Sequence, residues 1–283
     1  NVFLLPMPKR AAELSVTLFD THRKPLARLN HYVNPKDILI RNLSNAPKHE
    51  YKYIWRGGSP DTCIDVAVVA EGYTVSEMNK FYERAEETAQ SLFAAEPFKS
   101  YKYNFNIVAL AVPSQDTGVS IPGKGIWKST ALDSHFDTFY SDRYLTTLHL
   151  FKMHDALAGI PYEHIIILAN TDTYGGGGIY NSYTLTTAHH KLFGPVVVHE
   201  FGHSFAGLAD EYAYDWEEIP MFPLDVEPWE ANITTLADFK GKWESLIEKG
   251  TPIPTPETKD EKKAKNKVGY FEGAGYRTKG VYR

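Results

Sequence analysis

The chain has 283 residues, which is enough for one large domain or two unequal ones. Its net charge of −5 is mild, and no basic run is interleaved with aromatic residues, so the composition argues against a nucleic-acid partner. No stretch approaches the roughly 20 apolar residues of a membrane span, and Asn1-Val2-Phe3 does not begin like a signal peptide. We therefore expect no membrane span in this chain and interpret it as a mature fragment.

The first part of the chain predicts a small β-sandwich-like domain over residues 1–58. Leu14 to Asp20 alternates apolar and polar side chains, and segments rich in proline and asparagine separate the short strands. Gly57 to Pro60 has the composition of a linker. We accordingly predict a second, larger domain over residues 59–283.

The larger domain alternates strand and helix patterns, which predicts a mixed sheet packed with helices and an α/β fold class. The helix from residue 76 begins with a serine cap, Ser76. The predicted strands are 64–70, 106–112, 164–169 and 178–187, and the predicted helices are 76–93, 142–158 and the segment from Thr187 onward.

One short motif lies in the last of these helices: Val196-Val197-Val198-His199-Glu200-Phe201-Gly202-His203. On a helix, His199 and His203 are one turn apart, so both imidazoles can reach one metal ion while Glu200 faces the water bound beside it. This spacing predicts a hydrolytic zinc site with Glu200 as the general base. The alternative is an ordinary buried helix, in which the two histidines bond to backbone and the glutamate pairs with a cation.

A catalytic zinc needs a third protein ligand, and Asp210 is the first candidate beyond Gly207, a glycine that can end the helix and turn the chain back. Glu211 is a close rival. The spacing familiar from metzincins would put the ligand at position 209, which is Ala209, so this chain is one residue longer there.

Other residues have two interpretations each. Tyr183 and Tyr212 are candidate donors to the oxyanion or ordinary core residues. Gly175 to Gly178 either lets a substrate backbone approach an edge strand or turns the chain between strands. Met221 is either the methionine turn that lies beneath the metal or an ordinary methionine on the surface or in the core. The methionine turn could also lie beyond Arg283.

Four further features have simple interpretations. His189 and His190 are expected to cap the helix or face solvent, and Asp172 to serve turn chemistry or hold a cation. We expect Cys63 to be a buried structural thiol. The composition of the segment from Thr251 to Lys267 predicts a solvated mobile loop.

Taken together, these motifs resemble the immunoglobulin A endopeptidase family of bacterial zinc metallopeptidases over roughly residues 60–283, and residues 1–58 resemble the β domain that precedes the peptidase in that family's gut-anaerobe members. The motifs are Ile64 to Thr74, Glu96-Pro97-Phe98 with Phe105-Asn106, Tyr174 to Gly178, and His199 to Tyr212. The resemblance implies a metzincin-like domain with zinc on His199, His203 and Asp210, and Glu200 as the base. It does not imply that immunoglobulin A is the substrate, because few members share it.

The resulting hypothesis is a secreted, cell-surface or periplasmic endopeptidase that acts on protein or peptide substrates. Two alternatives stay open: a catalytically silent surface module that binds protein or glycan, and a zinc hydrolase of a non-peptide amide.

Overall fold

The computed structural model describes residues 5, 7–40, 42–43, 49–214, 221–257 and 267–283. The chain divides into two compact units, one built mainly from residues 41–207 and the other from residues 4–40 and 208–283. The predicted mobile loop at 251–267 falls mostly on residues 258–266, which lie outside the described part of the chain. Among the described residues, no helix has both the length and the apolar character needed to cross a membrane.

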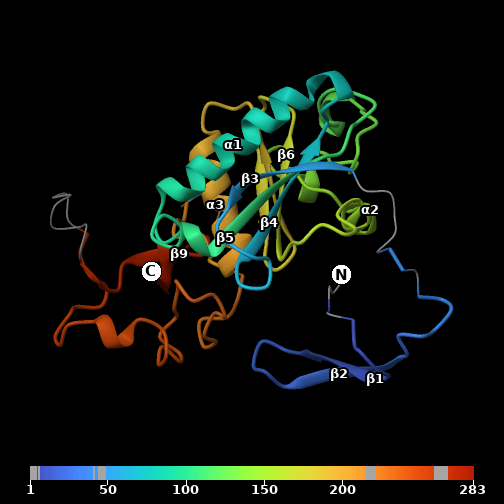
Figure 1. Cartoon of the computed structure of the whole chain (residues 1–283). Helices are drawn as coiled ribbons and strands as arrows, with labels where there is room; N and C mark the ends of the chain where they lie inside the picture. The colour runs from blue at the N-terminus through green and yellow to red at the C-terminus, as the bar shows by residue number, and fades with distance from the viewer. Residues whose placement is uncertain (1–4, 6, 41, 44–48, 215–220, 258–266) are drawn as a thin grey trace. The chain divides into compact units, whose positions relative to one another are not determined.

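The larger unit is organised around a six-stranded mixed sheet with the strand order β3-β5-β4-β6-β8-β7 (Figure 1). The four central strands β5, β4, β6 and β8 are parallel, and the two edge strands are antiparallel to their neighbours. The sheet and its helices confirm the predicted mixed α/β class. Their bounds are β3 Glu50–Arg56, β4 Ile64–Glu71, α1 Met78–Ala94, β5 Phe105–Ala111, α2 Leu150–Ala156, β6 His164–Ala169, β7 Gly176–Ile179, β8 Tyr183–Thr187 and α3 Phe193–Ala206.

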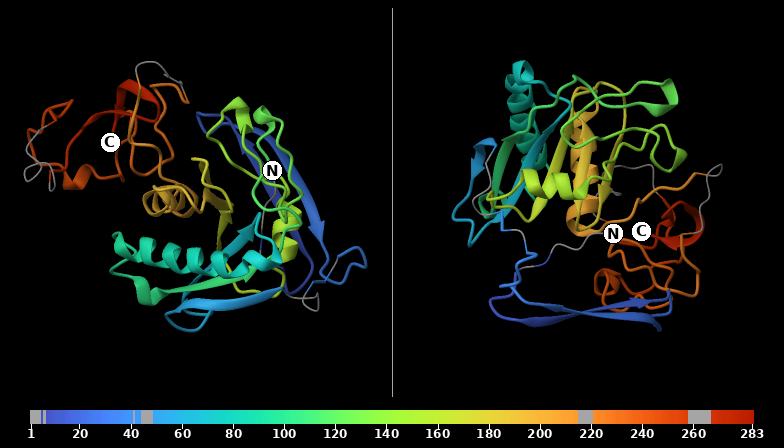
Figure 2. Two further views of the ribbon diagram at one scale, coloured as in Figure 1. Left: turned by 90° about the horizontal axis from the view of Figure 1, so that it is seen from above. Right: turned by 90° about the vertical axis from the view of Figure 1, so that its right-hand side faces the viewer.

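Each face of this sheet has its own core, because side chains alternate along every strand. Val66 and Val68 of β4 point to the face covered by α1 and α3. Ala67 and Val69 point to the opposite face, where α2 and the long segment before it cover the sheet (Figure 2). A central strand that is buried on both faces has a nearly continuous apolar sequence. The mostly apolar sequence of residues 64–70 was therefore enough to predict this strand.

The carboxylate of Glu71 ties the long segment before α2 to the end of β4. Glu71 is fully buried and accepts hydrogen bonds from the Thr130 hydroxyl at 2.6 Å, the Leu132 N–H at 2.8 Å and the Ser134 N–H at 2.9 Å. Hydrogen bonds to a buried charge are among the strongest in proteins. Glu71 therefore anchors the segment before α2 to the end of β4.

Two predicted elements are shorter or divided in the structure. The predicted helix 142–158 is helical only over α2, because residues before it make strand-like contacts instead: Thr146 bridges to His135, and Tyr144 to Gly176. The predicted strand 178–187 is a hairpin, in which β7 and β8 pair antiparallel around a turn where Asn181 has a φ of 53°. Asparagine tolerates this left-handed conformation better than most residues.

Helix starts also differ from the predictions. The helix predicted from Ser76 is preceded by a short 3-10 turn whose cap is Thr74: its hydroxyl and N–H both lie within hydrogen-bond distance of Glu77. The helix predicted from Thr187 onward begins only at Phe193. Ala188, which lies before it, is not helical, because its N–H donates to the carbonyl of Ala169 in β6.

The predicted linker at 57–60 is bound to the sheet at its start. The Gly57 N–H donates to the Phe105 carbonyl at 2.9 Å and lies 3.0 Å from the Asn106 side-chain oxygen. A Cβ at Gly57 would come within 2.4 Å of the Tyr103 carbonyl oxygen, so only glycine fits against this backbone. β3, which precedes the glycine, is an edge strand of the main sheet.

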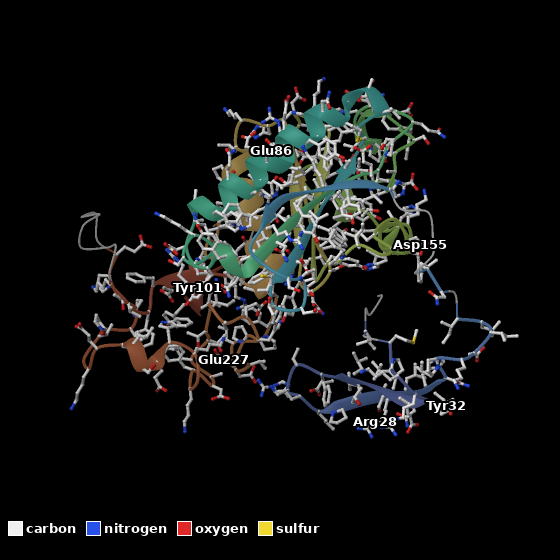
Figure 3. The ribbon with its side chains drawn as sticks, viewed as in Figure 1. Arg28, Tyr32, Glu86, Tyr101, Asp155 and Glu227 are labelled. Atoms are coloured by element: carbon white, nitrogen blue, oxygen red, sulfur yellow. The ribbon has the colours of Figure 1, made fainter. Side chains whose placement is uncertain are left out.

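The second unit contains two antiparallel pairs, β1 with β2 and β9 with β10. Arg28 and Tyr32 lie on the same face of β2, as the alternation of a strand requires (Figure 3). Among the described residues, β1 and β2 pair only with each other, so the β-sandwich and its boundary at residue 58 stay predictions. The bounds are β1 Ala12–Phe19, β2 Pro25–Val33, β9 Glu272–Ala274 and β10 Arg277–Tyr282.

Candidate metal centre

Helix α3 buries one face against the sheet and leaves the other accessible. Phe193, Val197 and Phe201 recur at every fourth residue and are buried, as is Ser204 one turn further on. The helix ends at Gly207, which has a φ of 61° and donates its N–H to the His203 carbonyl at 3.0 Å. The predicted glycine stop is therefore present, and the histidines lie on the face away from the core.

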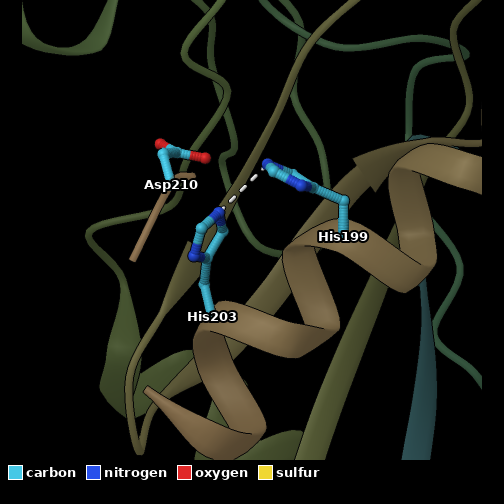
Figure 4. A group of neighbouring side chains, drawn as sticks. All are labelled: His199, His203 and Asp210. Atoms are coloured by element: carbon cyan, nitrogen blue, oxygen red, sulfur yellow. Dashed lines mark hydrogen bonds between the residues drawn. The ribbon is translucent and has the colours of Figure 1, made fainter. Parts of the chain in front are cut away.

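His199 and His203 present their rings side by side on that accessible face (Figure 4). Their Nε2 atoms are 3.0 Å apart. Two ligands bound tetrahedrally at zinc–nitrogen distances of about 2.0–2.1 Å would be separated by about 3.3 Å. The pair is therefore arranged closely enough to share one ion.

Asp210 completes a three-residue group with the two histidines. One ligand atom from each of His199, His203 and Asp210 lies within 4.8 Å of the others (Figure 4). Among the described residues, no other group of three or more potential metal ligands meets this criterion. Two imidazoles and one carboxylate form a donor set that fits a catalytic divalent metal and leaves a coordination position for water.

The rival third ligand, Glu211, has its carboxylate engaged elsewhere. Its Oε1 accepts a hydrogen bond from the Asn232 side-chain amide at 2.9 Å. The same amide group also donates to the Ala209 carbonyl at 2.9 Å, and the Asn232 side-chain oxygen accepts from the Ala209 N–H at 2.8 Å. Asn232 thus holds the backbone of Ala209, which precedes Asp210, and the side chain of Glu211, which follows it.

Asp210 itself is held by a turn far away in sequence. The Gly275 N–H donates to the Asp210 carbonyl at 2.8 Å, and the Tyr276 hydroxyl donates to Asp210 Oδ2 at 2.6 Å. Sequence reasoning missed both Asn232 and Tyr276. No local pattern marks either residue, because each acts through a contact between segments that are distant along the chain.

Glu200 lies between the two histidines in sequence and against β7 in space. A Cβ at Gly176 would lie 3.2 Å from Glu200 Oε1, and one at Gly178 would lie 2.2 Å from the Glu200 carbonyl oxygen. These glycines therefore allow α3 to approach the edge strand, a role that differs from both interpretations of the glycine run.

The two tyrosines considered as oxyanion donors, Tyr183 and Tyr212, differ in burial and in hydrogen bonding. Tyr183 is fully buried, its hydroxyl donates to the Thr147 carbonyl at 2.7 Å, and burial raises its pKa to about 12. It is a core residue and not an oxyanion donor. Tyr212 is half-buried near Asp210; burial, together with the negative charge of Asp210, raises its pKa. Tyr212 remains a candidate.

The other residues singled out in the sequence are not members of the three-residue group. The His189 ring bonds to the Asn170 side-chain oxygen at 2.9 Å, and burial lowers its pKa, while His190 accepts the Leu192 N–H near the start of α3. Asp172 is exposed. Met221 has 63% of its surface exposed, which matches the surface interpretation and not a buried methionine turn.

Comparison with known families identifies the family to which the chain belongs. The family model described as IgA peptidase M64 matches residues 54–268. The chain belongs to this family. The M64 match contains α3, both histidines, Glu200 and Asp210, and it ends before β9 and β10. No curated protein matches the chain. Family membership makes the chain a peptidase and therefore a hydrolase.

Proposed function

We propose that this M64 peptidase is a zinc-dependent endopeptidase in which His199, His203 and Asp210 hold the metal and Glu200 is the general base. The observation that carries the proposal is the three-residue group on and after α3 in a chain of a peptidase family. Two neutral imidazoles with one carboxylate are typical ligands of catalytic zinc. The same hypothesis takes residues 59–283 as a metzincin-like domain and residues 1–58 as a β-sandwich-like domain.

The proposed chemistry assigns Glu200 a proton-transfer role. When bound, zinc supplies a Lewis acid that lowers the pKa of a coordinated water to about 7. Glu200 accepts the proton of the attacking water and later delivers it to the leaving amine. The Glu200 carboxylate lies beside Gly176 of β7. Because Gly176 has no side chain, β7 does not cover this carboxylate at that position.

Strand β7 supports a mode of substrate binding. It is the edge strand next to β8, and the Gly176 N–H donates away from β8 to the Arg143 carbonyl at 3.3 Å. Backbone groups alternate along a strand, so the N–H and C=O of Gly178 face the same side as those of Gly176. We propose that an extended peptide pairs with β7 at Gly178, next to α3. The substrates would be proteins outside the cell, in keeping with a secreted, cell-surface or periplasmic enzyme.

The proposal is tested with the full chain and a broad peptide library. The wild type is expected to hold about one zinc per chain, to cleave peptides, to lose cleavage in a chelator and to regain it when zinc is added back. Glu200→Gln is expected to keep its zinc and its thermal unfolding but to lose about 100-fold or more in turnover. Glu87→Gln, a change on α1 in a partly exposed side chain that pairs with Arg84, is the matched control and should cleave like the wild type.

Two results would overturn the proposal. A zinc-loaded wild type that binds peptides tightly but cleaves none would indicate a surface-binding module. Cleavage confined to a non-peptide amide would indicate a hydrolase of another class.

A further inference from the structure

The turn that joins β9 to β10 contacts Asp210 with both its backbone and a side chain. Gly275 and Tyr276 form this turn with φ values of 57° and 63°. A tyrosine with positive φ is uncommon, because the left-handed conformation brings Cβ close to the following carbonyl oxygen. The conformation directs the Gly275 N–H to the Asp210 carbonyl and the Tyr276 N–H to the Tyr212 carbonyl, 2.8 and 3.4 Å away.

The Tyr276 side chain extends from this turn to the Asp210 carboxylate. Its hydroxyl donates to Oδ2 at 2.6 Å, across 66 positions in the sequence. The Tyr276 ring packs edge-on against the Tyr212 ring, with centroids 5.8 Å apart. A half-buried ring packed in this way restricts the position of its hydroxyl.

We propose that Tyr276 is a positioning residue that fixes the Asp210 carboxylate in the orientation that binds the metal. The inference rests on the proposed function, because it concerns the third ligand of the same site. A carboxylate that binds a metal through one oxygen has a second oxygen to satisfy, and hydrogen bonds to ligating groups typically change metal affinity by about 10- to 100-fold. A phenol supplies this bond without adding charge.

With Tyr276 included, the site extends beyond the part of the chain that the family match covers. That match ends at residue 268, whereas Tyr276 lies between β9 and β10. The turn is supported by a small core of its own, in which Ile233, Ala274 and Val281 are fully buried. The third ligand therefore depends on a hairpin that follows the matched region.

The test compares Tyr276→Phe with Tyr282→Phe in the full chain. Both changes remove one phenolic hydroxyl from the same hairpin, but the Tyr282 ring packs against Tyr270. Zinc affinity is measured by competition with a chromophoric chelator, and the ligand field by the visible spectrum of the cobalt-substituted protein. Tyr276→Phe is expected to weaken zinc binding about 10- to 100-fold and to alter the cobalt spectrum, while Tyr282→Phe changes neither.

A double-mutant cycle with Asp210→Ala identifies the route of the effect. If Tyr276 acts through Asp210, adding Tyr276→Phe to Asp210→Ala should not weaken zinc binding further. Unfolding by urea in a chelator measures the metal-free stability of each variant. Tyr276→Phe also loses the hydrogen bond to Asp210 in the metal-free protein, so zinc affinity is compared under conditions in which this measurement shows each variant to be folded.

The outcomes separate the inference from the proposed function. Wild-type zinc affinity in Tyr276→Phe, or an additive effect in the cycle, would overturn the role of Tyr276. Wild-type zinc affinity in Asp210→Ala would instead overturn the ligand assignment of the proposed function.

Discussion

Gly178 of β7 lies directly against His203 of α3. A Cβ atom on Gly178 would be 2.7 Å from the His203 Cβ and 2.2 Å from the Glu200 carbonyl oxygen. Real Cβ atoms do not approach backbone atoms this closely, so the edge strand and the helix can be in contact only because residue 178 has no side chain. The position of the two histidines relative to the sheet therefore depends on this glycine.

We predict that Gly178→Ala displaces α3 and impairs the metal centre. The added methyl group must push apart two backbone segments, and overpacking of this kind typically costs about 1–3 kcal/mol of unfolding free energy. Urea unfolding should show this loss, and chelator competition should show weaker zinc binding.

Gly177→Ala is the matched control for this prediction. The nearest atom to a Cβ at Gly177 is the Leu145 carbonyl oxygen at 3.4 Å, which is an ordinary van der Waals contact. The variant should bind zinc like the wild type. Equal losses in both variants would show that the strand is sensitive to any side chain and would contradict the specific role of Gly178.

A second prediction distinguishes Asp210 from Glu211. Asp210→Ala should lose zinc on dialysis, because it removes one of the three proposed ligands. Glu211→Ala should retain zinc, because the Glu211 carboxylate is bonded to Asn232. Metal analysis after dialysis measures both variants, and the reverse order of retention would assign the ligand role to Glu211.

A third prediction concerns acid stability in the second unit, where Glu227 (Figure 3) pairs with Lys242. The two side chains are 8% and 12% exposed, and Lys242 Nζ lies 2.7 Å from Glu227 Oε1. Burial by itself raises the pKa of Glu227, but hydrogen bonds from Lys242, Thr234 and the Asp238 N–H outweigh it, so the net pKa is lowered.

The sign of the pH effect follows from this lowered pKa. A carboxylate with a depressed folded-state pKa contributes stability above its unfolded pKa of about 4.3, and that contribution is lost as the pH falls through the folded pKa. Glu227→Gln should therefore be less stable than the wild type at pH 7, and the difference should shrink as the pH falls below about 4. Urea unfolding across this pH range provides the measurement.

Glu86→Gln is the control for the charge change. Glu86 (Figure 3) lies 3.4 Å from Lys52, and both side chains are about half exposed. Exposed ion pairs contribute about 0–1 kcal/mol, so this variant should differ little from the wild type at any pH. A difference between wild type and Glu227→Gln that grows on acidification would refute the assigned direction of the pKa.

The sequence by itself was enough to predict the central strands and the paired histidines. Residues 64–70, 106–112 and 164–169 are mostly apolar, with one polar residue each at or near the start (Asp65, Asn106 and His164), and each contains a buried strand of the parallel part of the sheet. His199 and His203 come together because a helix repeats every 3.6 residues. Both signals are local, since the spacing within a few residues already determines which side chains share a face.

Tertiary contacts decided the remainder. Residues 142–149 form no helix, because Tyr144 and Thr146 bridge to Gly176 and His135, and the glycine run serves the approach of α3. Asp210, and not Glu211, lies in the group with the two histidines, and Asn232 and Tyr276 form hydrogen bonds with the segment after the helix. A hydrogen bond between residues 66 positions apart leaves no periodicity in the sequence, because it forms only when distant segments have packed together.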